Sequence, residues 1–100
     1  MLTQAQLIKQ LQKEYPRLVT EYGVKNIGIF GSYAKGIPTE SSDIDLIIEF
    51  EYPIGFKFIE LAEYLEDVFG KKVDILTPAG IQAMRLNQVA QDITDSIVYV

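Results

Sequence analysis

The chain has 100 residues, a formal net charge of −5, and neither cysteine nor histidine. Its length fits one small domain over residues 1–100, and its 48% hydrophobic content suffices for a packed core without disulfides. The missing residue types exclude disulfides, zinc–thiolate and His-ligated zinc sites, Ser-His catalysis, and the usual general base near neutral pH. The acidic charge argues against direct binding to nucleic acid, which needs a basic face.

The first predicted element is an amphipathic helix between Thr3 and Gly23. Thr3 and Gln6 form a capping box at its start, and Gly23 is a typical residue for its end. Pro16 interrupts the pattern, so either one kinked helix or two consecutive helices are expected. The apolar residues that recur at helical spacing are Leu7, Ile8, Leu11, Tyr15, Leu18, Val19 and Tyr22.

Two predicted strands follow, over residues 24–30 and 43–50. Between them, residues 32–36 predict the first turn of a short helix and residues 37–42 predict a loop. This connection is too short for an ordinary crossover between parallel strands, so the two strands are expected to be antiparallel.

The rest of the chain continues this alternation of helices and strands. Its predicted elements are an amphipathic helix over residues 58–69, a strand over 72–76, one broken or two short helices over 81–84 and about 88–95, and a possible short strand over 97–100. The order is α-β-β-α-β-α with a possible last strand. It predicts an α/β fold with a mixed sheet covered by helices, whose second and third strands run parallel.

Three aspartates on the predicted strands are candidate functional residues. Asp43 and Asp45 are separated by one residue, so a strand places their carboxylates on one face, about 7 Å apart. Asp74 lies in mid-strand, where a lone aspartate is unfavourable, and it joins the pair if the third strand lies beside the second. Carboxylates clustered without a basic neighbour stay ionised if they hold a hard cation. In the alternative interpretation, Asp43 caps the strand entry while Asp45 and Asp74 face water.

Gly31 and Ser32 directly follow the first strand and form a candidate phosphate-binding turn. Glycine lets the backbone approach a ligand closely, the following N–H groups point outward, and the serine hydroxyl adds a donor. The segment is neither a Walker A loop nor a dinucleotide-binding glycine fingerprint. A phosphate-binding turn beside metal-binding carboxylates is typical of two-metal phosphoryl or nucleotidyl transfer.

The motifs G-S-Y-A-K-G, S-D-I-D-L-I-I and K-K-V-D-I-L resemble the polymerase-beta-like nucleotidyltransferase superfamily, and more narrowly the minimal nucleotidyltransferase (MNT) antitoxin family. The resemblance covers nearly the whole chain. It implies that Gly31 and Ser32 bind the phosphates of ATP and that Asp43 and Asp45 bind two Mg2+ ions. It further implies that Asp74 shares the catalytic ion and helps deprotonate the acceptor. Family members often have arginine at the position of Lys35, so this lysine either contacts phosphate or is simply solvated.

The same resemblance implies a function: transfer of AMP from ATP to a tyrosine hydroxyl of a partner HEPN-domain toxin, which the modification inactivates. A chain this short has little left to build an acceptor pocket, which independently favours a partner chain. Two alternatives stay open. The protein could be a non-catalytic antitoxin that acts by occlusion, or a nucleotide sensor or transferase subunit that acts on a hydroxylated small molecule.

Other charged residues and the expected location complete the sequence-based hypotheses. The acidic residues of the third helix are expected on a solvated face or against a basic partner: Glu60, Glu63, Glu66 and Asp67. Arg85 is either a surface residue or a phosphate contact. The sequence has no signal-peptide pattern and no apolar run near 20 residues, so a cytoplasmic location without membrane contact is expected.

Overall fold

The computed structural model describes residues 2–82 and 97–100 of the chain. The elements in chain order are α1 (Gln4–Tyr22), β1 (Val24–Phe30), α2 (Gly31–Ala34), β2 (Ile44–Phe50), α3 (Lys57–Phe69), β3 (Val73–Leu76), α4 (Pro78–Gln82) and β4 (Val98–Tyr99). None of the described helices is long and apolar enough to cross a membrane. The helices predicted over 83–84 and 88–95, and Arg85, lie outside the described residues.

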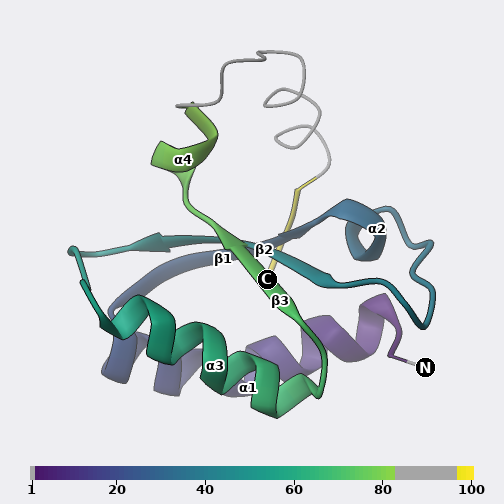
Figure 1. The fold of residues 1–100 in the computed structure, drawn as a ribbon, viewed down its shortest axis with the longest axis horizontal. Coiled ribbons are helices and arrows are strands. Elements are labelled where there is room, and N and C mark those ends of the chain that lie inside the picture. Colours follow the sequence, from purple (N-terminus) through teal and green to yellow (C-terminus); the bar gives the residue numbers. More distant parts are fainter. Residues whose placement is uncertain (1, 83–96) are drawn as a thin grey trace.

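The four strands form one mixed sheet in the order β3-β2-β1-β4. β1 pairs antiparallel with β2 and with β4, whereas β2 pairs parallel with β3. This confirms the predicted mixed α/β fold and the direction of both connections. α1 and α3 lie side by side against one face of the sheet, and α4 lies on the opposite side (Figure 1). The face away from α1 and α3 is therefore the one available for a site.

α1 begins and ends where local sequence signals place its caps. Thr3 Oγ1 accepts from the backbone N–H of Gln6, whose side chain accepts from the N–H of Thr3. Gly23 ends the helix in the left-handed conformation with φ 65°. Pro16 is accommodated inside a single helix, and its carbonyl oxygen accepts a hydrogen bond from the Thr20 hydroxyl. The open choice at Pro16 is thereby settled in favour of one helix.

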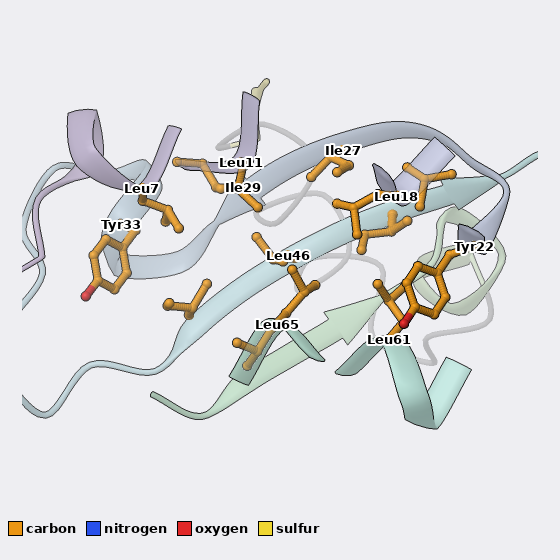
Figure 2. Packing of buried hydrophobic residues seen from close by; sticks show 14 residues of the cluster. Leu7, Leu11, Leu18, Tyr22, Ile27, Ile29, Tyr33, Leu46, Leu61 and Leu65 are labelled. Carbon is orange, nitrogen blue, oxygen red and sulfur yellow. The ribbon is translucent and has the colours of Figure 1, made fainter. Parts of the chain in front are cut away.

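The core lies between the sheet and the pair α1 and α3 (Figure 2). Among the described residues no polar or charged residue is buried, so this layer is held by apolar packing. Its fully buried side chains come from both helices, the two central strands and α2: Leu7, Leu11, Leu18, Val24, Ile27, Ile29, Tyr33, Ile44, Leu46, Ile48, Leu61 and Leu65.

Tyr33 is the one side chain in this core with an unsatisfied polar atom among the described residues. Its hydroxyl is buried without a hydrogen-bond partner, and Figure 2 shows it directed away from Leu7 at one end of the core. A buried, unpaired hydroxyl costs roughly 1–3 kcal/mol of desolvation. We therefore expect Tyr33→Phe to raise the melting temperature, by several degrees for a domain of this size. Thermal unfolding followed by circular dichroism checks this, and a clear decrease would show that the hydroxyl has a stabilising partner.

Candidate functional site

Asp45 and Asp74 are brought together by the pairing of β2 with β3. The parallel register places Asp45 opposite Asp74, on strands whose usual separation is about 4.8 Å. Ile44 and Leu46 are fully buried beneath the sheet, so Asp45 between them projects to the opposite face. Asp43 is exposed and directly precedes β2. The condition under which Asp74 joins the pair, a third strand beside the second, is therefore met.

The electrostatics of Asp45 show that the three carboxylates interact. Its pKa is raised above the ordinary value, mainly because the side chain is partly buried, and further by the negative charges of Asp74 and Asp43. Asp45 is thus not fully solvated, and within residues 2–82 and 97–100 no cation lowers its pKa. This is the environment in which an added cation binds favourably, and it disagrees with the alternative in which Asp45 simply faces water.

Lys72 is a basic neighbour that the sequence analysis did not anticipate. Its Nζ lies 3.9 Å from Asp74 Oδ1, with side-chain exposures of 66% and 48%. Lys72 directly precedes β3 and is two residues before Asp74. An exposed pair at this distance contributes little energy. Asp74 therefore has a counter-charge that a bound cation can displace.

Gly31 packs directly against the Asp45 carboxylate. It has φ 71°, and a Cβ added to it would overlap Asp45 Oδ2. Its chain neighbour Phe30 is the antiparallel register partner of Asp45, which explains the close approach. Ser32 follows on α2 and is partly buried. The predicted turn therefore lies directly beside one of the predicted carboxylates at the end of β1, whereas Lys35 is exposed.

Three side chains that hold this site in place were missed by sequence reasoning. Gln4 Nε2 donates to the carbonyl oxygens of two α2 residues at 2.9 Å, which ties α2 to α1. Glu66 Oε2 accepts from the N–H of Val73 at 3.1 Å and links α3 to the strand that carries Asp74. Lys71 Nζ donates to the Glu40 carbonyl at 2.8 Å in the loop that leads to Asp43. The prediction that Glu66 lies on a solvated face is therefore wrong.

The donor set fits a hard cation that completes its coordination with substrate. The candidate ligands are all carboxylate oxygens, which suit Mg2+. Within residues 2–82 and 97–100, no three acidic side chains are gathered closely enough to enclose an ion by themselves. Mg2+ is usually held by one or two carboxylates together with phosphates and water, so a preformed cage is not required. The residues fit Mg2+ bound jointly with a polyphosphate.

Comparisons with known proteins agree with this geometry. A family model described as a nucleotidyltransferase domain matches residues 5–100. The protein adenylyltransferase MntA of Thermococcus cleftensis is 37% identical, covering 100% of this chain and 98% of its own. A chain of Methanocaldococcus jannaschii named as a candidate protein adenylyltransferase is 40% identical, with 100% of both chains covered.

Solved structures show the same fold at lower identity. A candidate minimal nucleotidyltransferase has a TM-score of 0.74 at 22% identity, covering 97% of this chain and 95% of that chain. A toxin–antitoxin crystal structure with AMP-PNP has a TM-score of 0.63 at 21% identity, covering 98% of this chain and 72% of that chain. Because the family model and relatives of full length agree with the fold, the chain belongs to the nucleotidyltransferase domain family and is an enzyme of that family.

Proposed function

We propose that this protein is an antitoxin that transfers AMP from ATP to a tyrosine hydroxyl of a partner HEPN-domain toxin and thereby inactivates it. The observation that carries the proposal is the placement of Gly31 against Asp45, with Asp74 opposite in register. A phosphate-binding turn and interacting carboxylates in one site match the needs of nucleotidyl transfer. The relatives named as protein adenylyltransferases support a protein acceptor.

Each residue of the site has a defined role in this proposal. Gly31 and Ser32 hold the triphosphate through backbone N–H groups and the serine hydroxyl. Asp43, Asp45 and Asp74 would hold Mg2+, two ions in this proposal, and the bound ions would neutralise the triphosphate and lower the pKa of the acceptor hydroxyl. Asp74 takes the proton from the acceptor. The acceptor oxygen bonds to the α-phosphorus, the bond from that phosphorus to the oxygen bridging to the β-phosphate breaks, and pyrophosphate leaves.

The acceptor must be held largely by another chain. Among the described residues, α1 and α3 cover one face of a small sheet, and Asp45 projects from the face away from these helices, where the short α4 also lies. Structural neighbours described as the toxin–antitoxin pair MntA-HpeT support a toxin as that partner. The AMP-PNP complex of another such neighbour supports ATP as the donor. The same proposal places the reaction in the cytoplasm.

The test is transfer of radiolabel, with Mg2+ present, to the protein encoded by the gene next to the one for this chain. That protein, the adjacent-gene product, is the candidate partner. ATP labelled at the α-phosphate should label the partner, whereas ATP labelled at the γ-phosphate should not, because pyrophosphate is released. When the tyrosines of the partner are replaced one at a time with phenylalanine, the substitution at the modified position should remove the label. Lack of α-label in the partner, with the complex intact, would refute the transfer and favour occlusion. Label on a small hydroxylated molecule instead would favour the transferase-subunit alternative.

A further inference from the structure

The outward face of α3 carries exposed apolar and acidic residues that the nucleotidyltransferase site does not use. Phe56, which directly precedes α3, is 91% exposed, and Ile59 one turn later is 60% exposed. Glu60, Glu63 and Asp67 continue the same stripe, because residues three or four apart share a helix face. We call these five residues the α3 outer face. Large exposed apolar side chains beside charged ones are typical of a surface that contacts another protein.

An open groove of about 610 Å³ runs beside this face, between α3 and the second half of α1. Its two cations are already engaged within the groove. Arg17 Nε lies 3.0 Å from Glu21 Oε2, and the Arg17 guanidinium lies 4.8 Å from the centre of the Tyr64 ring. Lys57 Nζ donates to the carbonyl oxygen of Glu21 at 3.3 Å. Among the described residues, neither cation forms an ion pair with Glu60, Glu63 or Asp67, and these three carboxylates outnumber the two cations beside them.

The charge of this surface decides which partner it fits. Carboxylates three and four residues apart on one helix repel one another and destabilise it. Nucleic acid and anionic lipid would add to this repulsion. A second copy of the chain would do the same, since a two-fold contact sets the same acidic residues against each other. A basic protein surface offsets the charge and covers the apolar residues.

We propose that the α3 outer face and its groove bind a basic amphipathic helix of the partner toxin. A helix fits because the groove lies between two helices, and α3 with its 13 residues offers a contact about 20 Å long. Apolar side chains of the partner pack on Phe56 and Ile59, and its lysines or arginines lie beside the carboxylates. Asp45 projects to the opposite face of the sheet, so this contact leaves the catalytic side open. The identity of the partner rests on the proposed function, whereas the surface does not.

Two surface variants and one matched control test the proposal by calorimetric binding to the purified adjacent-gene product. Phe56→Ala/Ile59→Ser should weaken binding about tenfold or more, because exposed apolar anchors often dominate interface energy. Glu60→Gln/Asp67→Asn should weaken binding several-fold and reduce its salt dependence. Ala5→Lys/Gln12→Lys changes the net charge by the same amount on exposed positions of α1 and should leave the affinity unchanged.

The outcomes separate this surface from the activity proposed above. Unchanged affinity in both α3 variants, or equal weakening in the α1 control, would overturn the proposal that the α3 outer face binds the partner. The absence of any complex would overturn it as well. Dimerisation of the chain alone, lost in Phe56→Ala/Ile59→Ser, would assign the face to a second copy instead. A complex that depends on the α3 outer face but shows no AMP transfer would refute the proposed transfer and support the proposed binding surface. When transfer occurs, the α3 variants should raise KM for the partner and leave kcat unchanged.

Discussion

Replacement of Asp45 with asparagine is expected to lower AMP transfer about a thousandfold while raising the melting temperature of the metal-free protein. The activity falls because a metal-held carboxylate stabilises the transition state by several kcal/mol, and about 1.4 kcal/mol corresponds to a tenfold change in rate. The measurement is the initial rate of label transfer at saturating Mg2+. Glu49→Gln is the matched control, since it removes a carboxylate from the same face of β2 and should retain activity.

The gain in stability follows from the raised pKa of Asp45, caused first by burial and then by Asp74 and Asp43. Because this pKa is higher in the folded than in the unfolded chain, the charged carboxylate opposes folding. Its penalty is absent below the unfolded pKa of about 4 and becomes complete as the pH rises through the folded value. The amount by which Asp45→Asn melts higher than wild type should therefore increase as the pH rises from below 4 toward neutrality. A variant that melts lower than wild type at neutral pH would show that Asp45 is structural.

Replacement of Gly31 with alanine is expected to impair both stability and transfer. Its φ of 71° is a left-handed conformation that costs a non-glycine residue roughly 1–2 kcal/mol. The added methyl group would also displace the Asp45 carboxylate, which it would overlap. We therefore expect a loss of stability of at least about 1 kcal/mol and a rate close to that of Asp45→Asn.

Gly36→Ala separates the two causes of this loss. Gly36 has a similar φ of 74°, but an added Cβ would meet no atom within 4 Å. This variant should show the backbone cost in thermal unfolding and retain its rate of transfer. Equal loss of activity in Gly31→Ala and Gly36→Ala would contradict a specific role for the contact between Gly31 and Asp45.

The elements that the sequence predicted well are those with local signals. The capping box at Thr3 and Gln6 and the glycine at position 23 place the ends of α1, because each acts on backbone groups within a few residues. The outcome at Pro16 was not predictable, since the helix is held on both sides of it by the buried residues Leu11 and Leu18. Such packing depends on the whole fold and overrides a local helix breaker.

For the site, spacing alone predicts that Asp43 and Asp45 share a face, because strand geometry is local. Asp43 directly precedes β2, so this stays a prediction. The pairing of Asp45 with Asp74 depends on the register of two parallel strands separated by α3, and the sequence could only state it conditionally. The ion pair of Lys72 with Asp74 had a local signal, since the two residues are only two positions apart in the sequence. The hydrogen bonds from Gln4 to α2 had no local sequence signal, because they join residues about 30 positions apart.

The central claim is that one site, formed by Gly31, Ser32 and the three aspartates, holds the metal and the triphosphate together. A crystal structure of the full chain with Mg2+ and a non-hydrolysable ATP analogue tests it most directly. We predict metal density in contact with carboxylate oxygens of Asp43, Asp45 and Asp74, and phosphates against the backbone of Gly31 and Ser32. A nucleotide bound away from this turn, or metal that contacts none of these carboxylates, would contradict the account.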